Sequence, residues 1–409
     1  MKIVNAEAYT ILDSTGYPTI EVRLTDEKNN TAKGAAPRGS TVGEFECMQI
    51  YNKRNTFNFD FVDDSILLFN NKIRNNIINN SYDNFREFDA HLLKLDPTPN
   101  KCNIGGNTIL ASSIAFCELE AMNKGLELYE IFGHKSSMFF PNMMFNLVDG
   151  TLGSKLKGIE FLIISKGGDI EKQLISAKRT FSYLERIILN SNETVSYSNQ
   201  GALQMTDFAI EEILRIIKNI SDGFDLGLDM AMSDRKIENS TKYNLPLLNG
   251  NYIESNDLPK IYKYWHKIFN VNYIEDGFHY NDFKGWEDLM SGYENVLIAG
   301  DDLYATNINR IEEYDYLANS VVIKPNQIGT ISETIEAILL AKDTGKQTII
   351  SQRTSEIRNT IIADLAYSYG VNYVKFGGLN RNDRIDKYNR LLEIARIERN
   401  KYALRDIKW

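Results

Sequence analysis

The stretch Val321-Val322-Ile323-Lys324-Pro325-Asn326-Gln327-Ile328-Gly329-Thr330 decides how the rest of the chain is interpreted. Three β-branched residues run directly into a lysine, and a Pro-Asn turn and the helix-forming run 332–342 follow. This order predicts a buried strand, a short loop and a helix, with Lys324 at the strand end. In a barrel of parallel strands that end faces the active site, where desolvation disfavours the charged amine and makes it a usable base. Because a lysine that simply extends into solvent is more common, the interpretation depends on the other strand ends.

Length and composition set broad limits on the fold and on the partners. A chain of 409 residues is longer than one hydrophobic core usually serves, so two domains are expected. Hydrophobic residues at 43% and charged residues at 25% are typical of globular proteins. The net charge of -9 argues against a nucleic-acid surface. No apolar run approaches the ~20 residues that span a bilayer, so no membrane association is expected.

The cysteines and the first residues bear on the compartment. Cys47, Cys102 and Cys117 show neither CxxC spacing nor an even framework, which favours free thiols in a reducing compartment. Residues 1–7 contain no apolar core of a signal peptide. The sequence therefore predicts a cytoplasmic protein.

The first third of the chain has the pattern of an α+β domain, which we expect to cover residues 1–135. A polar, glycine-bearing loop at 37–43 could close over a ligand. Strong helical periodicity runs from 105 to 132. The strands predicted ahead of these segments are 2–12, 18–24 and 31–36.

After Pro141 the pattern changes to short apolar runs that alternate with long amphipathic helices. Alternation repeated this often predicts a β/α (TIM-like) barrel of parallel strands over residues 136–409, and with the first domain an α/β fold class. The apolar runs are 160–164, 226–229, 271–276, 296–302, 321–324, 348–353 and 372–375. The predicted helices are 207–219, 256–269, 307–318, 331–345, 355–370 and 381–399.

Asp229, Glu275 and Asp301 each end a different predicted strand. Three carboxylates at one barrel mouth would repel each other, and a divalent cation removes that repulsion. An all-oxygen ligand set favours Mg²⁺ over zinc. Together with Lys324, these acids predict proton abstraction α to a carboxylate, with the metal stabilising the enolate.

Other charged residues at strand ends have simpler explanations. A single acid after a strand is more often a helix N-cap or part of a solvated turn, and we keep that explanation for Asp276 and Asp302. Arg353 and Lys375 would supply positive charge for a phosphate or a carboxylate. Taken singly, each of these two could equally form a surface salt bridge.

With these residues in place, the chain resembles an enolase along nearly its whole length. The resemblance implies an α+β capping domain on a β/α barrel, dependence on Mg²⁺, and a homodimer. The matching stretches are 11–14, 16–19, 105–107, 126–129, 227–229, 274–276, 300–303, 324–329 and 386–389.

Positions that match the family's motifs imply roles for individual residues. Asp229, Glu275 and Asp301 match the metal ligands, and Lys324 matches the general base. Glu160 matches one of two glutamates on the leaving-group side.

Substrate-binding positions follow in the same way. Lys375, Arg353 and Thr354 match residues that hold the substrate's carboxylate or phosphate. Thr41 replaces a loop serine that helps to bind a second magnesium, and it keeps the hydroxyl.

The departures from the family pattern lie on one side of the reaction. Gln200 stands where enolases have a second catalytic glutamate that handles the departing hydroxide, and an amide cannot donate that proton as an acid. Gln352 replaces a histidine in the substrate-binding set. The family's mobile-loop histidine is also missing, because no histidine occurs between His134 and His266 and the loop 149–154 is two residues shorter.

Selective change on the leaving-group side suggests a changed substrate. The sequence therefore predicts a Mg²⁺-dependent, enolase-like lyase that performs β-elimination on a small phosphorylated or phosphonylated hydroxy acid, as a specialised biosynthetic relative. One alternative is ordinary dehydration of 2-phosphoglycerate with an altered acid side. Another is a catalytically inactive, enolase-like binding protein, although a binder has no need of the base Lys324.

Overall fold

An antiparallel sheet opens the chain, with strands β1 (Ile3–Leu12), β2 (Pro18–Asp26) and β3 (Thr31–Ala35) in that order. Asp13 stabilises the β1–β2 turn because its carboxylate accepts hydrogen bonds from the backbone amides of Thr15 and Tyr17. All three predicted strands are confirmed. The computed structural model describes residues 1–39, 42–52, 59–133, 139–150, 154–191, 194–205, 208–247, 250–293 and 295–405.

Helix α4 (Gly106–Lys124) covers one face of this sheet and is buried on nearly all sides. The single helix predicted over 105–132 is wrong in one respect, because α4 ends at Gly125, which adopts the left-handed conformation (φ 61°) common after a helix. A separate turn of helix follows as α5. The remaining helices of this region are α1 (Asp63–Leu68), α2 (Asn75–Ile77), α3 (Phe85–Leu95) and α5 (Leu128–Ile131).

Eight strands of the described chain close into a barrel, because β14 pairs with β4 as well as with β13. The barrel interior is filled by apolar side chains that include Met144, Leu162, Val322 and Ile349, so it is a packed core and not a pore. In order around the barrel the strands are β14 (Tyr373–Lys375), β13 (Gln347–Ser351), β12 (Ser320–Ile323), β11 (Leu297–Gly300), β10 (Val271–Glu275), β7 (Asp225–Asp229), β5 (Glu160–Ile164) and β4 (Asn142–Asp149).

The prediction of a wholly parallel barrel is wrong at β5, which runs antiparallel to both β4 and β7. A direct connection, without a helix in its described part, joins β4 to β5, so β5 enters the barrel from the opposite end. As a result the first residue of β5, Glu160, lies at the same rim as the last residues of the other strands. Strand β4 itself was not predicted, because its continuous apolar run lacks the alternation that distinguishes a strand from a buried helix.

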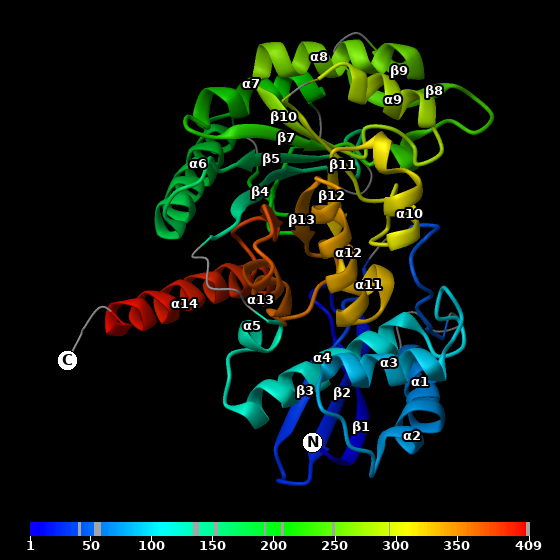
Figure 1. Cartoon of the computed structure of the whole chain (residues 1–409). Coiled ribbons are helices and arrows are strands. Elements are labelled where there is room, and N and C mark those ends of the chain that lie inside the picture. Colours follow the sequence, from blue (N-terminus) through cyan, green and yellow to red (C-terminus); the bar gives the residue numbers. More distant parts are fainter. Residues whose placement is uncertain are drawn as a thin grey trace.

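Helices surround the barrel (Figure 1). The predicted helix 355–370 begins only at Ile361, because residues 355–360 form a loop on which Glu356 contacts Ser14 of the first domain. Helix α6 was not predicted. The helices are α6 (Ile170–Asn190), α7 (Ile210–Ile220), α8 (Leu258–Phe269), α9 (Phe283–Ser291), α10 (Ile308–Glu313), α11 (Pro325–Ile328), α12 (Ile331–Asp343), α13 (Ile361–Ser368) and α14 (Asn382–Arg405), and the short strands β6 (Leu203–Gln204), β8 (Lys242–Leu247) and β9 (Gly250–Glu254) lie outside the eight.

The N-terminal sheet and helices pack against one side of the barrel, seen in blue and cyan in Figure 1. Buried polar contacts join the two parts. Asp89 of α3 accepts hydrogen bonds from the amide and the hydroxyl of Ser332 on α12, at 2.9 and 2.7 Å. Lys101 forms an ion pair with Glu333 at 2.8 Å. Within the described residues, no helix combines the length and apolar character needed to cross a bilayer.

Candidate active site

Lys324 follows β12 at the barrel rim, where the strand turns into α11. Its ammonium group donates to a carboxylate oxygen of Asp301, which follows β11, and both side chains are 12% exposed. Gln327 holds the other oxygen of Asp301 at 2.8 Å, and Thr306 in turn donates to Gln327. The loop after β12 therefore fixes the lysine and its carboxylate partner as one unit.

Lys375 ends β14 and is surrounded by acids from three other strands. Its ammonium nitrogen lies 2.5 Å from Glu275, 2.9 Å from Asp229 and 3.3 Å from Glu160. The lysine is buried, and these three charges raise its pKa despite burial, which acts in the opposite direction. The predicted acids and lysines therefore do meet at one barrel mouth.

The surroundings of Lys324 and Glu275 shift the pKa of both groups, and the shift of Lys324 is opposite to the one expected from burial alone. Burial by itself would lower the pKa of Lys324, but the charges of Asp301 and Glu275 together raise it above its ordinary value. The expectation that desolvation lowers the pKa of Lys324 is therefore wrong for this arrangement of charges. In contrast, burial and the charge of Asp229 raise the pKa of Glu275 to about 7.

The acids Asp229, Glu275 and Asp301 fit a divalent cation. Glu275 is fully buried, and its Oε1 atom has no hydrogen-bond partner among the described residues. A buried carboxylate oxygen without a donor is costly unless a cation or a proton approaches it. The orphaned oxygen and the all-oxygen ligand chemistry both fit Mg²⁺.

A second group of acids, Asp276, Asp301 and Asp302, also brings ligand atoms within 4.8 Å of one another. Asp276 is 3% exposed, so the expectation of a solvated turn is wrong for it. Its carboxylate accepts hydrogen bonds from the backbone amides of Asp301 and Asp302, both at 3.0 Å. Since these bonds already use its oxygens, Asp276 fits a capping role better than a metal ligand.

Arg353 lies beyond β13 and faces the mouth from the side of the first domain. Its guanidinium forms two bonds to Glu46, at 2.8 and 3.1 Å, and one to Asn326 at 2.9 Å. The predicted anion-binding arginine is thus buried and preorganised by a carboxylate that sequence analysis did not single out. Thr354, next in the chain, accepts a hydrogen bond through its backbone carbonyl from Arg384. Thr41 lies outside the described residues.

The two glutamines that depart from the family pattern contact each other. Gln352 donates to the side-chain oxygen of Gln200, and the Gln200 amide donates to Glu160. Arg384, fully buried on α14, donates to the Gln352 oxygen. Asp149 also accepts from Gln200, at 3.4 Å. Sequence reasoning missed Arg384, which carries no signal within a helix, and Asp149, although an acid at the end of an apolar run could have indicated it.

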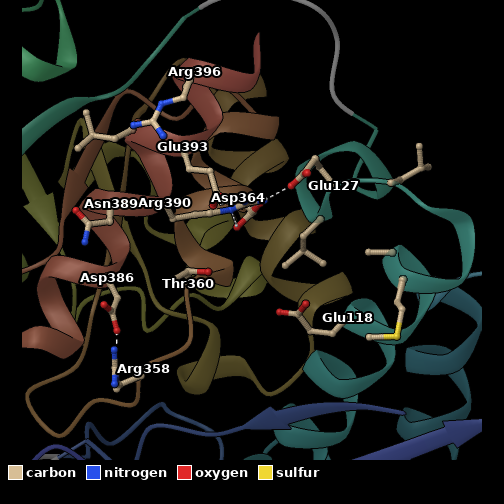
Figure 2. A pocket seen from close by; sticks show the side chains of 15 residues that line it. Glu118, Glu127, Arg358, Thr360, Asp364, Asp386, Asn389, Arg390, Glu393 and Arg396 are labelled. Carbon is tan, nitrogen blue, oxygen red and sulfur yellow. Dashed lines mark hydrogen bonds and ion pairs between the residues drawn. The ribbon is translucent and has the colours of Figure 1, made fainter. Parts of the chain in front are cut away.

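A cavity of about 810 Å³ lies elsewhere, between α4 and the helices α13 and α14 (Figure 2). Several of its charged residues pair with one another, since Arg390 bonds Asp364 and Glu127 and Arg358 bonds Asp386. Because most of these charges are paired and no lysine is among the described residues that line this cavity, the barrel mouth remains the better candidate for chemistry.

Comparison with known proteins decides the family. The signature described as "Enolase, N-terminal domain" matches residues 3–132, and "Enolase, C-terminal TIM barrel domain" matches residues 137–406. The chain belongs to the enolase family. It is 32% identical over 404 residues to "Enolase" of Ehrlichia canis, which covers 95% of both chains. It is also 32% identical over 440 residues to "Enolase" of Ureaplasma parvum, covering 100% of this chain and 99% of that one.

Membership in the enolase family confirms the resemblance, the fold class and a carbon-oxygen lyase of the phosphopyruvate hydratase type. The boundary that the sequence placed between residues 135 and 136 falls outside the described residues and stays a prediction.

Proposed function

We propose that this member of the enolase family removes the α-proton of a small phosphorylated or phosphonylated hydroxy acid and completes a β-elimination. One observation carries the proposal: Lys324 and Lys375 converge with Asp229, Glu275 and Asp301 at one barrel mouth. Such an array of opposite charges suits a reaction in which a carboxylate becomes an enolate dianion.

Asp229, Glu275 and Asp301 would hold Mg²⁺. When bound, the ion neutralises these carboxylates and stabilises the negative charge of the enolate. Lys324 can accept a proton only in its amine form, which the charge of Asp301 opposes in the ion pair. Lys324 therefore becomes a base when Asp301 is engaged by another positive charge.

The substrate's anionic groups would be held by cations that the fold already fixes in place. Lys375 is buried at the centre of the site, and Arg353 is oriented by Glu46. Thr354 and Gln352 flank the arginine, and Thr41 is proposed to act from the loop that follows β3. This set suits a carboxylate at one end of the substrate and a phosphate or phosphonate at the other.

The leaving-group side differs from the family pattern. The Gln200 amide contacts Glu160, which leaves a hydrogen-bond donor but no acid at that position. A specialised, biosynthetic relative with an altered leaving group or substrate tail fits this change. Dehydration of 2-phosphoglycerate itself is the second candidate, and the retained base favours both enzymes over an inactive binding protein.

We also propose a cytoplasmic homodimer. The three cysteines are free in the structure, as a reducing compartment requires. The cavity of Figure 2 shares Met122 and Arg358 with a neighbouring cavity of about 790 Å³. Exposed Leu12, Met122 and Leu126 lie along this recess, and exposed apolar side chains along a hollow suit a second copy of the chain.

Hydrogen exchange tests the proposed chemistry. The protein is incubated in D₂O with Mg²⁺ and 2-phosphoglycerate, then with phosphorylated and phosphonylated hydroxy acids, and NMR follows both the α-hydrogen and the appearance of an enol product. Loss of the α-hydrogen signal is expected with at least one compound. If none of them exchanges, the binding-protein alternative replaces the lyase.

A further inference from the structure

Asp149 is a buried carboxylic acid that none of the roles above uses. It is the last residue of β4 and is 7% exposed. In the antiparallel pair with β5 it lies directly opposite Glu160. Because opposite residues of such a pair have side chains on the same face of the sheet, the two carboxyl groups share the barrel mouth.

The pairing continues across the next strands and forms a row of acids. Glu160 lies opposite Asp229 on β7, and Asp229 is in register with Glu275 on β10. Like charges in directly opposed positions are destabilising, so such a row needs cations or protons. Lys375 lies within 3.3 Å of Glu160, Asp229 and Glu275.

Asp149 is the member of the row that Lys375 does not reach. Its hydrogen-bond partners within the described residues are neutral: the Gln200 amide at 3.4 Å and the Ser198 hydroxyl. Burial and the charge of Glu160 raise the pKa of Asp149 to about 7. Glu275 has a similarly raised pKa but pairs with Lys375, so Asp149 is the acid of this row that can hold a proton without giving up an ion pair among the described residues.

The topology separates this acid from the base. Strand β5 lies directly across the barrel from β12, four strands away in either direction, and β4 is its neighbour. Lys324 at the end of β12 and Asp149 at the end of β4 can thus approach a substrate in the mouth from different sides. This arrangement suits an anti elimination, in which the proton and the leaving group depart from opposite faces of adjacent carbons.

We propose that Asp149 is the proton donor to the leaving group, in place of the acid that position 200 lacks. This inference rests on the proposed function. Lys324 takes the α-proton, the C–H electron pair forms the enolate and then the carbon–carbon double bond, and the Cβ–O bond breaks. Asp149 gives its proton to the departing oxygen, which leaves as water, so that Asp149 ends as a carboxylate and Lys324 as an ammonium ion. The leaving group is then the β-hydroxyl, which departs as water, and the substrate class is a 3-hydroxy acid with an α-phosphate or α-phosphonate.

Gln200 has a part in this arrangement as a positioning residue. Its amide nitrogen donates to both Asp149 and Glu160, and its oxygen accepts from Gln352. The Gln200 amide therefore bridges the two acids without adding a further negative charge to the row. A glutamate at position 200 would add that charge, whereas the glutamine leaves Asp149 as the proton source.

The test is the variant Asp149→Asn, which keeps the side-chain shape and removes the acid. Two rates are measured on the same substrate: α-hydrogen exchange in D₂O and formation of the enol product. Exchange should stay within a few-fold of wild type, while elimination should fall ~10²–10⁴-fold, the usual effect of losing a positioned acid. The double variant Asp149→Asn, Gln200→Glu moves the acid to the neighbouring position and should recover part of the elimination rate.

Asp225→Asn is the matched control, because Asp225 begins β7 at the opposite end of the barrel and pairs with Lys166. It should leave both rates unchanged. Elimination by Asp149→Asn at the wild-type rate would overturn the assignment while the proposed lyase site stands, whereas exchange without elimination by wild type would overturn the proposed β-elimination as well. Absence of exchange in wild type would instead overturn the proposed function, and the role of Asp149 with it. Thermal unfolding of each variant shows whether it is folded.

Discussion

The proposed base Lys324 is paired with Asp301, and the carboxylates around it raise its pKa. This salt bridge holds the amine of Lys324 at a fixed position. Whether the amine can accept a proton depends on whether the Asp301 carboxylate stays paired with it. The same is true of Lys375, which neutralises three acids at once. At both lysines the charges of neighbouring acids therefore oppose the effect of burial, and together they leave the pKa raised.

Replacement of Lys324 by alanine should separate catalysis from metal binding. Lys324→Ala should reduce α-hydrogen exchange ~10²–10⁴-fold, because the proton acceptor is gone. Stabilisation by Mg²⁺ should remain, because the three proposed carboxylate ligands are intact. NMR exchange and thermal unfolding with and without Mg²⁺ measure the two effects. Exchange at the wild-type rate would show that another group is the base.

Individual site residues could be predicted where a charged side chain ends an apolar run. That pattern located Lys324 and Asp301, which the structure brings into contact. It did not locate Glu46, whose importance comes from its contact with Arg353, more than three hundred residues away in the chain. It also dismissed Asp276, because sequence does not show whether an acid after a strand is buried. Contacts between distant segments are the part that local patterns do not contain.

Among the secondary-structure elements, strand β3 and helix α4 pack so closely that only a glycine on β3 fits between them. A Cβ atom at Gly34 would lie 2.3 Å from the Ala115 amide nitrogen and 2.4 Å from the Ala111 carbonyl oxygen. Backbone atoms of a buried helix cannot move aside as a flexible side chain can. Strand β3 can therefore lie this close to α4 only because Gly34 has no side chain.

Gly34→Ala should destabilise the protein by about 1–3 kcal/mol or more, the cost of overpacking a closed interface. The midpoint of urea unfolding should fall accordingly. Lys33→Ala, at the exposed neighbouring position, serves as the control and should change the midpoint little. Equal midpoints for Gly34→Ala and wild type would mean that β3 can shift away from α4 without loss.

Asp89 connects α3 to the start of α12 and gives this contact a pH dependence. Burial raises the pKa of Asp89 to about 6, although Ser113 and Ser332 donate hydrogen bonds to it. A carboxyl group whose folded-state pKa is raised binds its proton more tightly in the folded state. Its contribution to stability therefore decreases as pH rises from about 4 to 6 and is constant above that range.

We expect Asp89→Asn to remove this dependence. Relative to the variant, the wild-type free energy of unfolding should fall by roughly 3 kcal/mol between about pH 4 and pH 7, at about 1.4 kcal/mol per pKa unit. Urea unfolding of both proteins across this range measures the difference. A constant difference at every pH would show that Asp89 titrates equally in the folded and unfolded states.

Most elements followed from periodicity, and the exceptions have physical causes. The strand Thr31–Ala35 and the long helix Asn382–Arg405 were predicted from their patterns. The direction of a strand could not be predicted in this way, because a hydrophobic pattern is the same whichever way the strand runs. For this reason β5 was predicted to be parallel to its neighbours. The loop 355–360 was assigned to a helix, because its contacts with the first domain cannot be inferred from the local sequence.

For the molecule as a whole, a ligand that binds only the folded state raises stability by mass action. At a Mg²⁺ concentration about 100 times Kd, the gain should be about 2.7 kcal/mol. Thermal unfolding should show a Tm that rises with Mg²⁺ and returns when EDTA is added. Glu275→Gln removes the charge of a proposed ligand and should weaken the shift. A Tm that is independent of Mg²⁺ would argue against a metal site built by folding.

The proposed homodimer can be tested by a substitution in the recess that the two neighbouring cavities form. Met122, 52% exposed, lines both of them. Met122→Glu would bury a charge in the proposed dimer interface and should shift the protein to a monomer in analytical ultracentrifugation. Tyr252→Glu, at an exposed position on β9 outside the recess, is the control. A wild-type monomer, or a variant that stays dimeric, would place the interface elsewhere or remove it.

The reversed strand β5 has a consequence for how such a protein can evolve. Because β4 leaves the barrel at Asp149 and β5 re-enters at Glu160, both ends of this connection are anchored on the same rim as the reactive side chains. Residues gained or lost between them would alter what can enter the mouth while every barrel strand keeps its register. Substrate preference could thus change through the connection between β4 and β5, without any change in the strands that carry the proton-transferring residues.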